Sequence, residues 1–169
     1  GATIDPITGF IHWEPRENGI SLGVRGSFNF PNNVVNRGSI SIPASASINV
    51  VSFTAEGWYK FDSLDSATLF RKYHSSFYNS WTLSNFFGTL RAEINNFGST
   101  PDVRLDTIRL TTDQWYHIAF SYDDTTRLAQ IYVNGELVGS VVSTGTPQLS
   151  NGELSVDGFE GTVANMRFW

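Results

Sequence analysis

The chain contains no cysteine among its 169 residues. This absence excludes disulfide bonds, zinc sites built on thiolates, and cysteine nucleophiles. It does not exclude an extracellular location, because a single domain of this length buries enough apolar surface to fold without covalent cross-links.

Charged residues are also scarce. Asp, Glu, Lys and Arg make up 16% of the chain, against an average of about 25%, and Ser, Thr, Asn and Gly fill their place. The net charge is −5 and the pI about 5.0, and the basic residues are scattered except for Arg71-Lys72. A nucleic-acid-binding domain carries a basic stripe, so we expect no nucleic-acid partner.

Long apolar runs are missing too. No segment approaches the ~18 apolar residues that span a bilayer, so we expect no membrane insertion. No helical periodicity extends beyond one turn, and no Asn-x-Ser/Thr glycosylation acceptor occurs. Because the chain starts at Gly1, we expect it to be a piece of a larger protein, extracellular or on a virion surface.

What the sequence does contain is a three-stranded block from Leu110 to Val142. Aromatic and β-branched residues predict a strand over Trp115–Tyr122, and a second follows at about Leu128–Val133. Asn134-Gly135 then predicts a type I′ hairpin, which needs φ > 0 at both central residues. The third strand returns through Leu137–Val142.

This block resembles the laminin-G-like, concanavalin A-like jelly roll, whose domains read W-x-H-v-A, a turn, then Y-v-[DN]-G-x-x-v. Here the two segments are Gln114–Ala119 and Ile131–Val138. Val24–Phe30 is similar to the opening strand of that family and Phe159–Trp169 to its closing strand. The resemblance covers roughly Gly26–Trp169 and implies that Trp58 and His117 are buried in the core.

The remaining strands come from alternating patterns bounded by Gly, Pro and Asn turns. They are expected near residues 39–43, 52–61, 68–72, 80–83, 88–94, 107–110 and 153–156. About twelve short strands with such turns predict an all-β fold. We expect an antiparallel β-sandwich of the jelly-roll type over residues 23–169, preceded by an irregular lead-in over residues 1–22 that packs on it. The closing strand is expected to pair near the first.

The sequence offers no catalytic constellation. Sandwich glucanases of the resembled superfamily carry carboxylates two residues apart on one strand, in the pattern E-x-D-x-x-E, and no such string occurs. Glu93 stands alone, and no G-x-S-x-G elbow or H-x-x-H spacing is present. We therefore predict that the protein is not an enzyme and has no catalytic residues; a hydrolase or lyase with an unfamiliar site is the third hypothesis.

Calcium is the most plausible metal, since relatives in the resembled family often hold one at the sandwich edge. Calcium takes six to eight oxygen ligands, several of them carboxylates. Where the family often has aspartate, this chain has Asn29 and Asn165, which weakens such a site, although Asp157 and backbone carbonyls could contribute. The expectation is no cofactor, with calcium as the alternative and its ligands unassigned.

The candidate binding site lies in the aromatic stretch Arg71–Phe87, RKYHSSFYNSWTLSNFF. Tyr73–Asn79 breaks both periodicities and predicts a loop, and aromatic residues in an exposed loop favour contact with a ligand. Flat rings stack on the C–H faces of sugars. The predicted ligand-binding residues are Arg71, Tyr73, His74, Tyr78, Trp81 and Arg104.

An alternative reading of the same stretch is that Phe77, Trp81 and Phe86 plug the end of the sandwich. A second loop over Asn95–Asp106 would frame a groove with the first if the two are neighbours, which the sequence leaves open.

These patterns predict a noncatalytic, lectin-like carbohydrate-binding module whose partner is a glycan or cell-surface polysaccharide. The alternative is a protein-adhesion or structural domain of a viral or phage surface appendage that binds no sugar. That reading predicts a homo-oligomer formed through the parent protein, for instance through an apolar face around Trp13 and Trp169.

Overall fold

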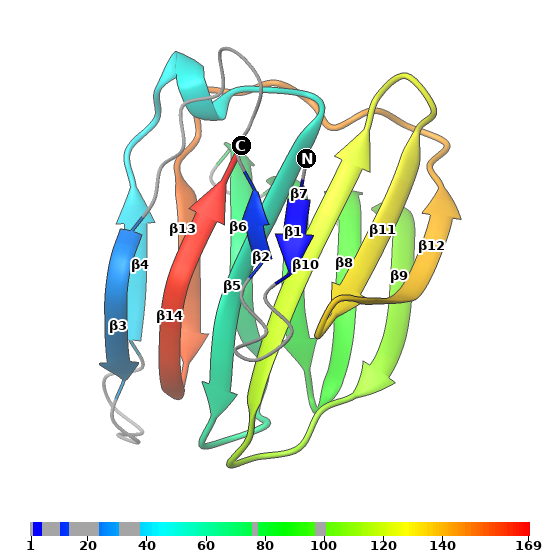
Figure 1. Cartoon of the computed structure of the whole chain (residues 1–169). Helices are drawn as coiled ribbons and strands as arrows, with labels where there is room; N and C mark the ends of the chain where they lie inside the picture. The colour runs from blue at the N-terminus through cyan, green and yellow to red at the C-terminus, as the bar shows by residue number, and fades with distance from the viewer. Residues whose placement is uncertain (1, 5–10, 14–23, 31–37, 76–77, 97–100) are drawn as a thin grey trace.

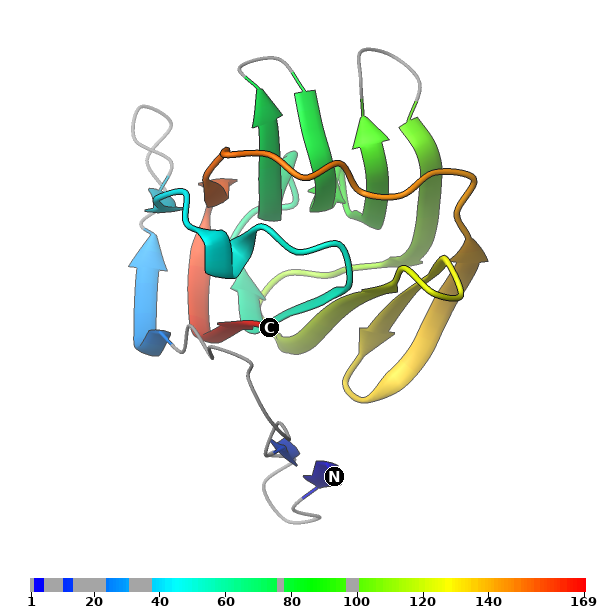
Figure 2. The same ribbon diagram turned by 90° about the horizontal axis from the view of Figure 1, so that it is seen from above.

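The computed structural model describes the backbone of residues 2–4, 11–13, 24–30, 38–75, 78–96 and 101–169, and side chains within 39–73, 79–95, 101 and 103–169. Over these residues the chain is a two-layered β-sandwich (Figures 1 and 2). The only helical segment described there is a single 3-10 turn, η1 (Ala46–Ile48). The predicted all-β antiparallel sandwich is confirmed.

The front sheet of Figure 1 has six antiparallel strands in the order β12-β11-β10-β5-β14-β3. Their bounds are β3 (Val24–Phe30), β5 (Phe53–Phe61), β10 (Trp115–Asp123), β11 (Leu128–Val133), β12 (Glu136–Val142) and β14 (Gly161–Phe168). The closing strand β14 pairs with the opening strand β3, as the sequence predicts.

The back sheet lies behind it and also has six antiparallel strands, in the order β4-β13-β6-β7-β8-β9. Their bounds are β4 (Gly38–Ile42), β6 (Ala67–Ser75), β7 (Tyr78–Phe86), β8 (Thr89–Asn96), β9 (Pro101–Arg109) and β13 (Leu154–Phe159). Two short strands of the lead-in, β1 (Ala2–Ile4) and β2 (Ile11–Trp13), pair only with each other; the rest of that lead-in lies outside the described residues.

The predicted hairpin behaves as its turn chemistry requires. Asn134 and Gly135 have φ of 52° and 83°, the two positive values of a type I′ turn. The Asn134 side-chain oxygen also accepts a hydrogen bond from the His117 backbone N–H at 2.9 Å. The hairpin β11–β12 is thereby tied to β10, which pairs with β5 at the centre of the front sheet.

The core fills the space between the sheets with aromatic rings. Phe53 of β5 stacks on Trp81 of β7 at 4.3 Å between ring centroids and 17° between planes. Phe168 of β14 stacks on the same indole at 5.9 Å, and Phe120 of β10 meets it edge-on at 6.1 Å. Residues from both sheets therefore converge on Trp81, whose side chain is 1% exposed.

The connection from β12 to β13 crosses one end of the sandwich (Figure 2). Buried polar side chains of three neighbouring strands donate hydrogen bonds to its carbonyls. Lys72 Nζ donates to the Ser150 oxygen at 3.1 Å, Ser80 Oγ to the Gln148 oxygen, and Asn95 Nδ2 to the Thr146 oxygen at 2.6 Å. Burial lowers the pKa of Lys72. This end of the sandwich is therefore covered by a segment that is tethered through its backbone carbonyls.

Candidate functional site: the polar face of the back sheet

The outer face of the back sheet carries a row of polar residues in register across all six strands. Successive cross-strand partners are Ser41, Ser155, Arg71, Thr82, Glu93 and Arg104. Their neighbours in sequence, such as Leu154, Leu83 and Ala92, belong to the buried core, so strand alternation turns the row outward. We call this set the central row.

A second row runs beside the central row. Its cross-strand partners are Asp157, Thr68, Ser84, Arg91 and Asp106. Together the two rows make the polar face, which spans strands that are distant in sequence.

Each of the three arginines of the polar face is paired with a carboxylate. Arg71 Nη2 lies 2.8 Å from Asp157 Oδ2, and Arg104 Nε lies 2.7 Å from Glu93 Oε1. Arg91 donates two hydrogen bonds to Asp106, from Nε to Oδ1 at 2.5 Å and from Nη2 to Oδ2 at 3.0 Å. These hydrogen bonds raise the pKa of Arg91. Fork-to-fork pairing of this kind fixes the guanidinium plane.

Two of these arginines also cover an aromatic ring. The Arg71 guanidinium carbon lies 4.0 Å from the centroid of the Tyr73 ring, and that of Arg91 lies 3.8 Å from the centroid of the Phe86 ring. One ring face of each aromatic is thus occupied by a cation.

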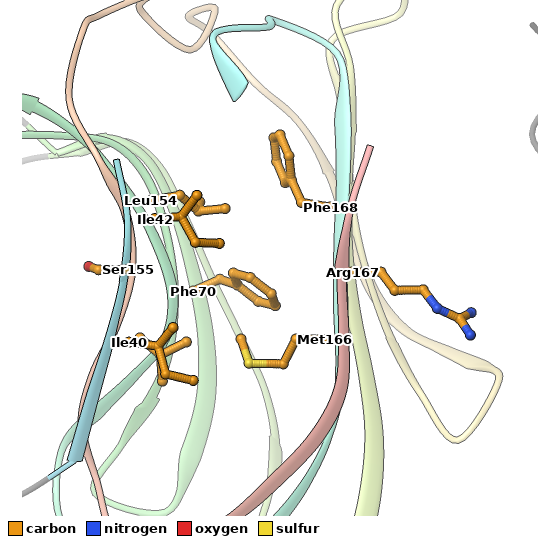
Figure 3. A pocket seen from close by; sticks show the side chains of 9 residues that line it. Ile40, Ile42, Phe70, Leu154, Ser155, Met166, Arg167 and Phe168 are labelled. Atoms are coloured by element: carbon orange, nitrogen blue, oxygen red, sulfur yellow. The ribbon is translucent and has the colours of Figure 1, made fainter. Parts of the chain in front are cut away.

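Three polar atoms of the central row have no hydrogen-bond partner. They are Arg71 Nε, Thr82 Oγ1 and Ser155 Oγ, and they come from cross-strand neighbours on β6, β7 and β13. Figure 3 shows the Ser155 side chain pointing away from the space between the sheets. A buried polar group without a partner costs about 1–3 kcal/mol, so these three adjacent atoms, which find no partner within the protein, would be stabilised by a ligand hydroxyl or a water molecule.

These atoms are nevertheless covered by surrounding side chains, and Thr82 and Ser155 are each less than a tenth exposed. A ligand therefore reaches them only when side chains on the polar face shift. Arg71 is the cross-strand neighbour of both Ser155 and Thr82. Its side chain is paired with Asp157 and stacked on Tyr73, and it is the largest side chain next to both hydroxyls.

Of the six predicted ligand-binding residues, the structure places Arg71 and Tyr73 in contact, whereas Arg104 is separated from them by β7 and β8. Arg71, Tyr73 and Arg104 lie on β6 and β9, with the two arginines in the central row and Tyr73 beneath Arg71. His74 is in β6 and Tyr78 in β7, so the expectation of a loop over Tyr73–Asn79 is wrong for their backbone. The side chains of His74, Phe77 and Tyr78 lie outside the described residues.

Trp81 is the clear correction. Its ring is enclosed by core aromatics from the front sheet and offers no surface to a sugar. The alternative reading, in which Trp81 fills the interior, holds for this residue, whereas Phe86 is 41% exposed and does not plug the sandwich. The prediction failed because the local sequence does not show whether an aromatic side chain flanked by polar residues points into the core or toward solvent.

The second expected loop, Asn95–Asp106, is wrong for Pro101–Asp106, whose backbone lies in β9; residues 97–100 lie outside the described part of the chain. The strand ends that flank residues 76–77 and 97–100 pair with each other, since Asn79 lies opposite Asn96. The polar face could have been found in the sequence from the spacing of its residues. Members of three pairs are two positions apart, as they are on one face of a strand: Arg71 and Tyr73, Arg91 and Glu93, and Arg104 and Asp106.

The front sheet has a smaller polar cluster on its own outer face. Glu56 lies 3.5 Å from His117 Nε2 and 3.3 Å from Arg167 Nη1, and the Trp58 ring lies 5.2 Å from the imidazole. His117 is buried, as predicted, but its partners place it outside the core between the sheets. Trp58 is half-buried there, so its expected core position is wrong.

An apolar pocket opens between the sheets near β4 and β14 (Figure 3). Ile40, Ile42, Phe70, Met166 and Phe168 point into it, and the charged end of Arg167 points away. No polar group converges on this space, so its lining fits core packing better than recognition of a polar ligand.

The described residues contain no group of three His, Asp or Glu side chains placed to hold a metal ion. Asp157, the carboxylate suggested for calcium, is paired with Arg71. Asn165 lies at an irregularity of β14 with φ of 50°, and the Asn29 side chain lies outside the described residues. Calcium stays an expectation. No helix in the described part is long and apolar enough to cross a membrane.

Comparison with known proteins agrees with the architecture. Residues 35–169 match the Concanavalin A-like lectin/glucanases superfamily, and the chain belongs to that superfamily. No curated protein matches the sequence.

Solved structures share the fold at low identity. Domain 4 of the extracellular arabinanase AbnA from Geobacillus stearothermophilus, in complex with arabinotriose, has a TM-score of 0.62 at 19% identity over 90% of this chain and 76% of that one. The CBM40 of Ruminococcus gnavus IT-sialidase, bound to α2,3-sialyllactose, has a TM-score of 0.61 at 15% identity over 79% and 90%. Domains LG4-5 of mouse laminin α1 have a TM-score of 0.63 at 12% identity over 86% and 41%.

Proposed function

We propose that this domain is a noncatalytic carbohydrate-binding module that holds a saccharide on the polar face of the back sheet. The observation that carries the proposal is the set of three adjacent polar atoms without partners, Arg71 Nε, Thr82 Oγ1 and Ser155 Oγ. Sugar hydroxyls donate and accept hydrogen bonds, so they suit a row of donors and hydroxyls. Glycan-binding modules among the proteins of similar fold support the same class of ligand.

The charged groups favour binding over catalysis. Glu93 and Asp106, on the neighbouring strands β8 and β9, are each paired with an arginine. A glycosidase needs one carboxyl that donates a proton and another that attacks or activates water. Two carboxylates that are engaged by guanidinium groups suit orientation of ligand hydroxyls instead.

We further propose that the module belongs to a larger extracellular or virion-surface protein. Binding through a few hydrogen bonds on an open sheet face is weak, because water competes for each of them. Several copies on one parent particle would raise the apparent affinity through effective concentration. The functional assay therefore needs a multivalent display.

The test is a glycan array probed with the multivalent domain, with and without calcium, in the wild type and in a Thr82→Val variant. Valine keeps the volume of threonine but removes the unpartnered hydroxyl, so we expect equal or higher thermal stability together with a loss of glycan binding. Thr162→Val, on the outer face of β14 in the front sheet, is the matched control and should bind as the wild type does.

If the Thr82→Val variant binds glycans as well as the wild type does, the polar face is not the glycan-binding site. A blank array from a folded, multivalent wild type would remove the carbohydrate itself from the proposal. Loss of binding on chelation would add the calcium ion that the sequence leaves open.

The adhesion or structural alternative has one observation in its favour. β12 is an edge strand of the front sheet, and Leu137 and Val142 on it are 51% and 62% exposed. Exposed apolar side chains on a sheet edge favour pairing with another chain. Sizing the particle in solution for the wild type and a Val142→Lys variant tests this reading, which requires an oligomer that the lysine disrupts.

A further inference from the structure

The charge pattern of the polar face narrows the class of ligand. We infer that this face selects uncharged oligosaccharides over sialylated, uronic or sulfated ones; the inference rests on the proposed function. The similar folds that hold arabinotriose and sialyllactose show that the fold itself permits both neutral and acidic sugars. The residues of the face must therefore decide.

The first argument is that no arginine of the two rows is left to neutralise an anion. Arg71, Arg91 and Arg104 are each bound to a carboxylate of the same face. An acidic sugar would have to displace one of these carboxylates and leave it facing the ligand. Arg109, at the end of β9, lies near Gly88 in the β7–β8 turn and outside both rows.

The second argument is that the two rows carry no excess of positive charge, since three carboxylates match three guanidinium groups. Besides Asp157, Glu93 and Asp106, the carboxylate of Glu153 accepts a hydrogen bond from Ser41 at the edge of the central row. Like charges in neighbouring cross-strand positions repel. The described part of the two rows thus offers an anionic ligand no net positive charge, and Glu153 adds a carboxylate at one edge, whereas a neutral ligand is unaffected.

The third argument is the chemistry and spacing of the unpartnered atoms. Two of them are hydroxyls, which both donate and accept, and one is an N–H, which only donates. Sugar hydroxyls can pair with all three by accepting or donating. The oxygens of a carboxylate or sulfate could also accept from all three, so these atoms set the length of the ligand, and the paired arginines set its charge. The three residues sit on three adjacent strands, so the row spans about 10 Å at the usual interstrand spacing. That length exceeds one sugar ring and favours an oligosaccharide laid across the strands.

The experiment compares neutral with acidic trisaccharides by calorimetry on the multivalent domain: arabinotriose and maltotriose against trigalacturonate and 3′-sialyllactose. We expect heat from neutral sugars only, with an affinity that changes little between low and high salt, because no ion pair forms. Tighter, salt-sensitive binding of an acidic sugar would overturn the inference and leave the proposed function intact. No binding by any sugar would overturn the proposed function, and the inference with it.

A charge-release variant separates this reasoning from general electrostatics. Asp157→Asn frees the Arg71 guanidinium at an exposed position, so we expect affinity for trigalacturonate to appear or to rise about tenfold, the effect of one hydrogen bond to a charged group. Asp62→Asn, exposed in the turn after β5, changes the net charge equally but away from the face. If both variants behave alike, or if Asp157→Asn gains no acidic ligand, the pairing of Arg71 does not set the specificity.

Discussion

Replacement of Trp81 separates a structural role from a ligand-binding role. The sequence places this residue among the candidate sugar contacts, whereas the structure encloses it between Phe53, Phe120 and Phe168. The perturbation is Trp81→Phe, which keeps a ring but leaves space where the larger indole packed. Trp115→Phe is the matched control, because Trp115 is 44% exposed at the start of β10.

The magnitude follows from the burial. A buried indole removes roughly 150–250 Å² from water, which at about 25 cal/mol per Å² corresponds to ~4–6 kcal/mol as an upper bound. Removal of the ring in Trp81→Ala should therefore destabilise the fold by about 3–5 kcal/mol, or lower Tm by roughly 6–20 °C for a domain of this size. For Trp81→Phe we expect about 1–3 kcal/mol, and for Trp115→Phe about 0.5 kcal/mol or less.

The assay is chemical and thermal unfolding followed by circular dichroism, since tryptophan fluorescence changes with the substitution itself. Glycan binding is measured on the folded proteins at a temperature below both transitions. We expect Trp81→Phe to lose stability and keep its affinity. A Trp81→Phe variant as stable as the wild type but unable to bind would refute the core placement and restore Trp81 as a ligand contact.

Two further predictions concern the interior and the turns. Burial raises the pKa of Tyr59 well above its usual value of 10, so this phenol ionises at lower pH in the unfolded chain than in the folded one. The free energy of unfolding should therefore fall as the pH rises above 10, and Tyr59→Phe should make that fall smaller in unfolding experiments from pH 8 to 11. An unchanged slope in the variant would contradict the prediction. Gly161 has φ of 140° and an added Cβ would lie 2.0 Å from the Lys60 carbonyl oxygen, while Gly135 has φ of 83° and open space around it. Gly161→Ala should therefore destabilise the fold by more than about 3 kcal/mol, whereas Gly135→Ala should destabilise it by only about 1–2 kcal/mol. If the two variants lower Tm equally, a backbone shift relieves the close contact at Gly161.

The strands were readable from the sequence because each one is a local pattern. Alternation of apolar and polar residues and the Asn134-Gly135 turn place β10, β11 and β12 to within a residue or two. The strands of the aromatic stretch were predicted too short, since β6 and β7 run on through residues that the sequence assigned to a loop. Serine, asparagine and histidine there signal a turn locally, but cross-strand pairing overrides that preference.

The sequence by itself determined the class of fold, the absence of thiol chemistry, and the alternation that puts Arg71 and Tyr73 on one face of a strand. Only the tertiary structure decided which face is buried, and so placed Trp81 in the core and Thr82 on the outer face of the back sheet, beneath neighbouring side chains. Only the tertiary structure placed Ser155 beside Arg71, which lies 84 positions earlier in the chain, and Arg71 beside Thr82. Strand order and register are set by long-range packing between the two sheets, and no pattern within a single strand contains them.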